Sequence, residues 1–182
     1  MALYYPSCAT PLVSYNCSPC PPAINGKIRS IAFIKNTYTF VDPTSTTEWT
    51  TAIAAGNAVV IWQTQGNYDA STSELTGWGD IPFYNGNTIH TLVFKDPNLA
   101  ENCDFYNDAK LTQDYTVAFR VGSLSNGLVF FANAPVIITP KSPVADDINS
   151  IMSWDVTVKW ANATLPCGYA TPANIFNRCY IV

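Results

Sequence analysis

Residues 154–160 read Trp-Asp-Val-Thr-Val-Lys-Trp, and apolar and polar side chains alternate along the whole segment. Successive side chains of a strand point to opposite faces of a sheet, so this period of two predicts a strand with one buried face. Other segments are rich in the β-branched and aromatic residues that favour strands: residues 28–41, 58–64, 114–122, 128–132 and 135–139. About eight strands joined by short turns predict an all-β fold, mainly an antiparallel β-sandwich or barrel.

An Asn-Gly pair, Asn85-Gly86, lies between the apolar runs IPFY and TIHTLVF. Asn-Gly is typical of two-residue hairpin loops, because both positions must adopt a positive φ. The sequence therefore predicts a hairpin at Asn85-Gly86. It also predicts a polar loop before it, over residues 65–80, where Ser, Thr and Gly are frequent.

The clearest helix signal follows the first predicted strand. Ser45 and Glu48 form a capping-box pattern, in which each side chain accepts a hydrogen bond from the other's backbone N–H. Apolar residues then fall at helical spacing: Trp49, Ala52 and Ile53. Gly56 suits the left-handed residue that ends a helix, so we predict one short flanking helix near residues 46–55. Residues 97–111 fit either a short helix or an irregular loop.

The N-terminal segment, residues 1–27, contains five of the thirteen prolines, and residues 1–26 carry no charged side chain. Proline opposes helix, so this segment predicts an extended arm. The arm is too apolar for a disordered tail, and we expect it to lie against its own body or a neighbouring subunit. A β-sandwich domain over residues 28–161 and an irregular C-terminal segment over residues 162–182 complete the predicted organisation.

Six cysteines are concentrated near the chain ends: Cys8, Cys17, Cys20, Cys103, Cys167 and Cys179. In an oxidising environment, disulfides could tie the terminal segments to the body or to each other, and six cysteines allow fifteen pairings. Cys17 and Cys20 also have the spacing of half a zinc site. A four-thiolate site needs a second close pair, however, and the sequence has none.

Charge is scarce in this chain. Charged residues make up 12% of the sequence, and the net charge is −4, whereas an average soluble domain is about 25% charged. No run of Lys or Arg exists to release counterions from phosphates, which argues against nucleic-acid binding. No stretch approaches the roughly 18 apolar residues of a membrane span. The N-terminus lacks a basic region, and Pro6 and Pro11 interrupt its apolar stretch, so it does not read as a secretory signal.

Candidates for chemistry are few. His90 is the only histidine and lies in an alternating strand, where a hydrogen-bonded or solvent-facing role is favoured over a general base. The acidic residues Asp96, Glu101, Asp104 and Asp108 lack the spacing of a calcium loop and suit turns instead. Trp78, in Gly77-Trp78-Gly79, is a candidate for stacking on a sugar. We predict no catalytic residue, no metal site and no cofactor.

A resemblance adds to these observations. The segments Ile31-Ala32-Phe33-Ile34, Tyr38-Thr39-Phe40-Val41-Asp42-Pro43 and Ala52-Ile53-Ala54-Ala55-Gly56, together with residues 154–160, resemble uncharacterised proteins of tailed phages and related mobile elements of Bacteroidetes-type hosts. The likeness covers roughly residues 24–160 and includes no diagnostic catalytic motif. It implies a structural, virion-type role.

These observations favour a non-enzymatic subunit that self-assembles into a larger particle, tube or fibre. Interface cores are poor in charge and rich in aromatic residues, and extended arms bind neighbours through main-chain hydrogen bonds. Candidate subunit contacts lie in the arm and in the uncharged stretch over residues 121–140: Leu3, Tyr4, Tyr5, Leu12, Val13, Tyr15, Leu128, Val129, Phe130, Phe131, Val136, Ile137 and Ile138. An interior position is an equal alternative for the second group.

The expected partners are further copies of the chain and other structural proteins. The expected location is a virion or an extracellular assembly, reached after synthesis in the cytoplasm. The alternative function is an extracellular β-sandwich binding module, an adhesin or carbohydrate-binding domain that uses Trp78.

Overall fold

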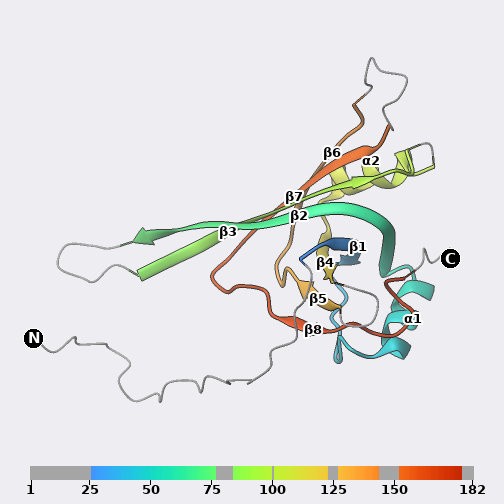
Figure 1. Cartoon of the computed structure of the whole chain (residues 1–182), viewed down its shortest axis with the longest axis horizontal. Coiled ribbons are helices and arrows are strands. Elements are labelled where there is room, and N and C mark those ends of the chain that lie inside the picture. Colours follow the sequence, from blue (N-terminus) through green and yellow to red (C-terminus); the bar gives the residue numbers. More distant parts are fainter. Residues whose placement is uncertain (1–25, 77–83, 100, 123–126, 144–151, 178–182) are drawn as a thin grey trace, which may run out of the picture.

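The computed structural model describes residues 26–76, 84–99, 101–122, 127–143 and 152–177 (Figure 1). In this part of the chain eight strands form one antiparallel sheet, and two short helices pack against it. The all-β prediction is therefore confirmed. The strands are β1 (Ile28–Lys35), β2 (Ala58–Thr76), β3 (Tyr84–Asp96), β4 (Tyr115–Val121), β5 (Leu128–Phe131), β6 (Ile137–Lys141), β7 (Trp154–Asn162) and β8 (Gly168–Ala170), and the helices are α1 (Thr46–Ala54) and α2 (Cys103–Thr112).

The strand order is β6-β7-β3-β2-β1-β4-β5-β8, and the sheet curls until its two ends meet. Residues 128–141 pair with β4 through β5 and with β7 through β6. Between these strands the chain stays on β4, since Ala132 N–H donates to the Val117 carbonyl at 2.9 Å and Val136 N–H to that of Tyr115 at 3.0 Å. The Gln113 side chain then bonds both backbone groups of Ile138. Of the two predicted architectures, the chain adopts the barrel type, because a single sheet closes on itself.

The barrel interior is filled by side chains that alternate along its strands. In β7, Trp154, Val156, Val158 and Trp160 are all buried, as their alternation predicts. The packed inner cluster also contains Phe33, Leu92, Phe94, Phe119 and Ile138. Helix α2 covers this cluster through Tyr106 and Ala109, so one of the two alternatives for residues 97–111, the short helix, is the correct one.

A second apolar cluster lies on the outer face of the sheet, beneath α1. Trp49, Ala52 and Ile53 of the helix pack there against β1, β4 and β5, together with Ile175 and Phe176. The helix prediction is confirmed: Ser45 caps the first turn, and Gly56 has a φ of +68°. The second half of the predicted capping box is wrong. Ser45 N–H donates to the Asp42 carbonyl, and the Glu48 carboxylate accepts from the N–H groups of Val41 and Asp42.

Two sequence predictions on the β2–β3 hairpin were wrong. The predicted polar loop over residues 65–80 continues strand β2 as far as Thr76, and Asn85-Gly86 lies within β3. Thr76 pairs with Tyr84 and Leu75 with Asn85, so the chain reverses between Thr76 and Tyr84. The Ser- and Thr-rich composition is compatible with a strand once a partner strand satisfies its backbone.

The ends of the barrel domain also differ from the prediction. Strand β1 stops at Lys35, because Tyr38 N–H turns back to the Lys35 carbonyl. The predicted irregular C-terminal segment contains β8, and the Phe176 carbonyl accepts from Ser30 Oγ at 2.6 Å and from Arg120 Nη1 at 3.3 Å. Arg120 is buried, and this burial, followed by the proximity of Arg29, lowers its pKa. The described part of the C-terminal segment is thus packed into the same body.

Candidate interaction surfaces

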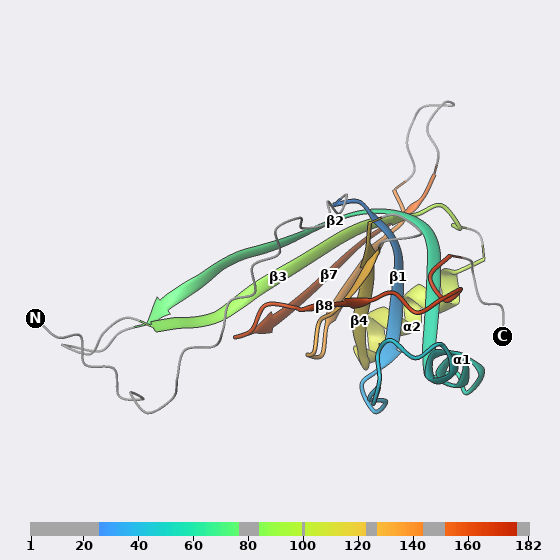
Figure 2. The same cartoon turned by 60° about the horizontal axis from the view of Figure 1, so that its bottom comes forward.

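The β2–β3 hairpin extends beyond the barrel as a two-stranded ribbon (Figures 1 and 2). Pairing between β1 and β2 ends where Ile28 meets Gly66, whereas β2 continues for ten more residues to Thr76. Within the described part of the chain, no strand pairs with the second edge of residues 67–76. We call this segment the free edge of β2. Such an edge presents a row of N–H and C=O groups that can pair with another chain.

The other strand of the ribbon is better covered. Strand β7 pairs with β3 from Asp96 to Thr88, so only residues 84–87 of β3 extend past it. The register of β2 and β3 shifts between Ser71 and Ser73 and again between Ser73 and Leu75. Bulges of this kind increase strand twist and bend the ribbon locally. The unpaired backbone is therefore concentrated on β2.

A second feature is a groove of about 440 Å³ at the opposite end of β1, which we call the aromatic groove. It is formed by the loop after β1, by Thr116 of β4, by the β5–β6 connection and by β8. Its aromatic rings contact one another. The ring centroid of Phe40 lies 5.1 Å from that of Tyr38 and 6.0 Å from that of Phe131, and the centroids of Phe131 and Tyr169 are 5.7 Å apart. None of the described residues that line it is charged: Ile34, Asn36, Tyr38, Thr39, Phe40, Pro43, Thr116, Phe131, Asn133, Ala134, Pro135 and Tyr169.

Hydrogen-bonding groups lie among these rings. Thr116 Oγ1 is buried and has no hydrogen-bond partner among the described residues. The neighbouring Asn133 is held at a φ of +51°, a left-handed conformation that Asn tolerates better than most residues. The groove thus combines aromatic walls with neutral polar groups, and at least one of these groups lacks a protein partner in the described structure.

His90 is buried in the barrel interior. Its Nδ1 lies 2.8 Å from the Tyr68 hydroxyl, and its ring stacks on Trp160 at 5.1 Å. Burial, followed by the proximity of Asp69, raises the pKa of Tyr68. Of the two sequence interpretations of His90, the hydrogen-bonded strand residue agrees with this geometry. A pocket of about 390 Å³ adjoins Tyr68 at this end of the barrel, with Phe119 and Phe130 in its wall.

The acidic residues near α2 serve the local structure. Asp96 is buried and accepts hydrogen bonds from Asn98 N–H, Asn102 Nδ2 and the Tyr106 hydroxyl. Asp108 accepts from the Tyr115 hydroxyl at 2.9 Å. Among the described residues, no cluster of three or more His, Cys, Asp or Glu side chains could hold a metal ion.

These contacts raise the pKa values of Tyr106 and Tyr115. Burial, then the charge of Asp96 and the hydrogen bond to it, raises the pKa of Tyr106 far above its usual range. Burial, then the hydrogen bond to Asp108, raises the pKa of Tyr115 to about 12. The acidic residues therefore favour the neutral tyrosines that fix α2 on the barrel.

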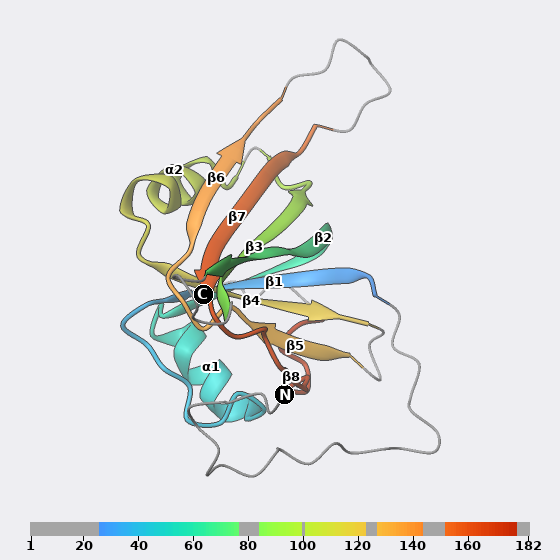
Figure 3. The same ribbon diagram turned by 90° about the vertical axis from the view of Figure 1, so that its left-hand side faces the viewer.

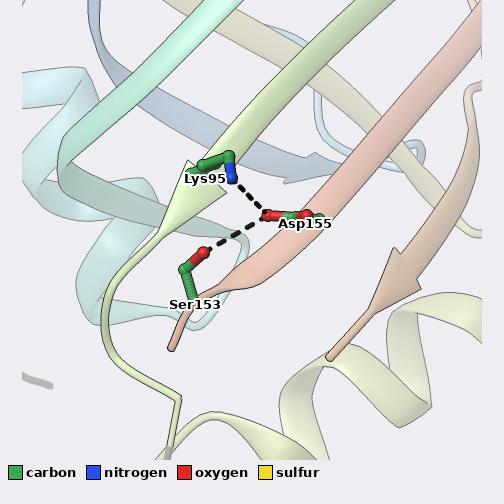
Figure 4. A network of polar contacts seen from close by, with 3 residues as sticks. All are labelled: Lys95, Ser153 and Asp155. Carbon is green, nitrogen blue, oxygen red and sulfur yellow. Dashed lines mark hydrogen bonds and ion pairs between the residues drawn. The ribbon is translucent and has the colours of Figure 1, made fainter. Parts of the chain in front are cut away.

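Figure 4 shows a polar network on the barrel surface, where Lys95 of β3 faces Asp155 of β7. Lys95 Nζ lies 3.5 Å from Asp155 Oδ1, which also accepts from Ser153 Oγ at 3.2 Å. The Lys95 side chain is 65% exposed, and an exposed ion pair contributes less than about 1 kcal/mol. This network links two strands and has no feature of a reactive site.

The structure divides the predicted subunit contacts. Val129, Phe131, Val136 and Ile138 are buried in the core of their own chain, so the interior alternative holds for them. Ile137 is exposed, and Leu128 and Phe130 are half-buried. The predicted contacts in the arm lie outside the described residues: Leu3, Tyr4, Tyr5, Leu12, Val13 and Tyr15.

Two of the six cysteines lie among the described residues. Cys103 and Cys167 are exposed free thiols, so the described residues contain no disulfide. Cys8, Cys17, Cys20 and Cys179 lie outside the described residues, as does Trp78, and the roles suggested for these residues stay predictions. Neither described helix has the length and apolar character needed to cross a membrane.

Comparison with protein-family models, with curated proteins and with solved structures finds no match for this chain. The two surfaces that stand out, the free edge of β2 and the aromatic groove, were both missed by the sequence analysis. The only available signal for the first was the presence of Tyr68, Thr72 and Thr76 within residues 67–76, since these residue types suit a strand as well as a loop.

Proposed function

We propose that this protein is a non-enzymatic structural subunit that self-assembles through the free edge of β2 into a larger particle, tube or fibre of virion type. The observation that carries the proposal is the ten-residue continuation of β2 past its last β1 partner (Figure 2). Proteins shorten, cover or charge long strand edges, because a bare edge recruits other chains. This edge carries Asp69 and Glu74 but is long and has one unpaired side among the described residues, and its length favours a partner strand.

A second copy of the chain is the simplest partner. Each copy carries the same edge, and antiparallel pairing of two identical edges forms a two-fold symmetric contact. Main-chain hydrogen bonds supply the affinity in this mode of recognition. Other structural proteins with a compatible strand would bind in the same way.

The chain's own N-terminal segment is a poor competitor for this edge. Extending β1 backwards from Ile28 would place the preceding residues beside residues 67–76, in continuation of the Ile28–Gly66 pair. That segment contains Pro19, Pro21 and Pro22, and proline has no N–H to contribute to a ladder. In this register the prolines fall opposite residues 72, 73 and 75, so the sequence disfavours an intramolecular cover for the outer part of the edge.

The test compares the full chain with a ribbon-trimmed variant, in which Asn-Gly replaces residues 72–88. Asn-Gly closes a two-residue hairpin, and the variant keeps every β1–β2 pair and all β3–β7 pairs except that of Thr88 with Asn162. Size-exclusion chromatography with light scattering should show wild-type species above the 19.9 kDa monomer, increasing with concentration. The variant, which keeps only residues 67–71 of the free edge, should associate clearly less at the same concentration. A wild type that stays monomeric throughout would overturn the proposal.

A control variant separates the edge from the face of the same sheet. Val93 on β3 is 43% exposed and lies next to exposed Ile89 and Lys95 in the alternation of that strand. Val93→Lys alters this face and leaves the backbone edge of β2 intact. It should assemble like the wild type. Assembly that is lost in Val93→Lys but kept in the trimmed variant would assign the contact to the face and contradict our proposal.

A further inference from the structure

An edge-to-edge contact between identical strands closes into a dimer, so a larger particle needs a second contact that does not close on itself. The aromatic groove is a candidate for that contact. In Figure 2 the segment between β1 and α1, which forms one wall of the groove, lies at the far end of β1 from the ribbon. A molecule bound there would not obstruct the free edge of β2.

The chemistry of the groove restricts its occupant. Tyr38, Phe40 and Tyr169 provide flat apolar surfaces, Thr116 offers a buried hydroxyl that has no partner among the described residues, and no described lining residue is charged. A charged ligand would lose solvation without gaining a counter-charge. The groove therefore suits a neutral ligand that has apolar rings and accessible carbonyl groups.

The N-terminal segment of this same chain has these properties. Residues 1–25 contain five prolines and no charged side chain. Proline-rich segments adopt polyproline II, a conformation without internal hydrogen bonds, so every carbonyl remains available to donors. Aromatic-lined grooves are the usual receptors for such segments, because the extended conformation is preformed and little entropy is lost on binding.

The position of this segment favours a groove on another copy. The described chain starts at Gly26, beside Ile28, whereas the groove lies beside Ile34 at the other end of β1. To reach its own groove the segment would have to turn back along β1, whose two edges are already paired with β2 and β4. Twenty-five residues of polyproline II span about 78 Å, which is long enough to reach a neighbour.

We infer that the aromatic groove binds the proline-rich N-terminal segment, residues 1–25, of another copy of the chain. This inference rests on the proposed self-assembly and names its second contact. The contact joins two different surfaces, so it propagates from copy to copy into rings or filaments. Together with the two-fold contact at the β2 edge, it would extend dimers into a larger particle.

The probe is a fluorescently labelled peptide of residues 1–25, in which Ser replaces the three cysteines, titrated with the full chain and followed by fluorescence anisotropy. We expect saturable binding. Tyr169→Ala should weaken it by at least about tenfold, an effect of 1.4 kcal/mol. A peptide in which Ala replaces Pro19, Pro21 and Pro22 should also bind at least about tenfold more weakly than the peptide with the prolines. Thr139→Ala, an exposed position on β6 outside the groove, is the matched control and should bind as the wild type does.

Thr116→Val keeps the shape of the side chain and removes only its hydroxyl, so it tests the groove without endangering the fold. It should weaken peptide binding while the unfolding transition stays in place. Equal binding by wild type, Tyr169→Ala and Thr116→Val would overturn the inference, and so would binding of a neutral oligosaccharide in place of the peptide. If the peptide fails to bind but the full chain still assembles, only this inference falls. If the peptide binds but the chain stays monomeric, the proposed self-assembly and the contact between copies both fall.

Discussion

The two halves of strand β2 differ in every property that matters for assembly. Residues 58–66 pair with β1, and within this half only Gln65 and Gly66 also pair with β3. This half includes buried apolar residues such as Val60 and Ile61. Residues 67–76 are paired with β3 alone and read Asn-Tyr-Asp-Ala-Ser-Thr-Ser-Glu-Leu-Thr. One continuous strand therefore changes its partner along its length, from β1 before Gln65 to β3 after Gly66.

The difference bears on the proposed contact between chains. The first half gains stability from apolar burial, of Ile61 in the barrel interior and of Val60 beneath α1. The pairs between β2 and β3 begin at Gln65, so residues 72–76 are the part of β2 that can be removed while β2 stays paired with β3. Strand edges that serve no purpose are usually short or covered. A long ribbon that extends beyond the barrel therefore supports the proposed contact with another chain.

The largest expected effect is inside the barrel. Ile61 is 7% exposed and belongs to the inner cluster, so Ile61→Ala should lower the free energy of unfolding by about 2–5 kcal/mol. Val59, two residues earlier on the same face of β2, is 38% exposed, and Val59→Ala should cost less than about 1 kcal/mol. Urea titration of both variants measures the difference. Equal losses would mean that the first half of β2 does not hold the core.

Gly66 marks the boundary between the two halves. A Cβ at this position would lie 3.0 Å from the Val93 carbonyl oxygen and 3.1 Å from Phe94 Cβ, and the paired β3 backbone has little room to yield. Gly66→Ala should therefore destabilise the protein by about 1–3 kcal/mol. Gly26, where a Cβ would meet nothing within 4 Å, provides the matched control. A neutral Gly66→Ala in urea titration would show that the two strands separate easily here.

The barrel should also set the alkaline limit of stability. The folded state raises the pKa of Tyr115 from 10.0 to about 12, so the unfolded chain releases this proton first as the pH rises. The stability from the neutral tyrosine is complete below pH 10 and is lost between pH 10 and about 12. Urea midpoints should fall over this range, and less steeply in Tyr115→Phe. Parallel profiles for the two proteins would contradict this assignment.

The smallest effect on stability is expected from the ribbon. The trimmed variant retains the barrel, so its free energy of unfolding should differ from that of the wild type by less than about 1 kcal/mol. Its alkaline profile should be unchanged, because Tyr106 and Tyr115 contact α2 and its neighbours. Calorimetry of the trimmed variant, performed at a concentration where the wild type is dissociated, measures the difference. A large loss would show that the ribbon supports the barrel, which would weaken the contrast between the two halves of β2.

Local sequence patterns correctly predicted the elements whose structure depends on residues a few positions apart. The alternation over residues 154–160 identified β7, and Ser45 with Gly56 delimited α1, because these patterns act within a few residues. The continuation of β2 was missed because Ser and Thr favour loops unless a partner strand satisfies the backbone. That partner, β3, follows on the far side of the reversal, and only the pairing register shows it.

The closed barrel and the groove depend on contacts between distant parts of the chain. Closure uses the Gln113 side chain on Ile138, and the groove brings Ile34 together with Tyr169. No residue spacing in the sequence predicts these long-range contacts. The same holds for the uncharged stretch over residues 121–140, which looked like a subunit interface because a barrel interior and an interface core have similar compositions.

Hydrogen exchange of the two halves of β2 tests the central claim most directly, since it reports on backbone hydrogen bonds residue by residue. The amides of residues 58–66 that bond to β1 or β3 should be protected at every protein concentration. The amides on the free edge, within residues 67–76, should exchange quickly in dilute solution and slow down as the concentration rises and copies pair. Exchange in residues 67–76 that is the same at low and high concentration would contradict the account.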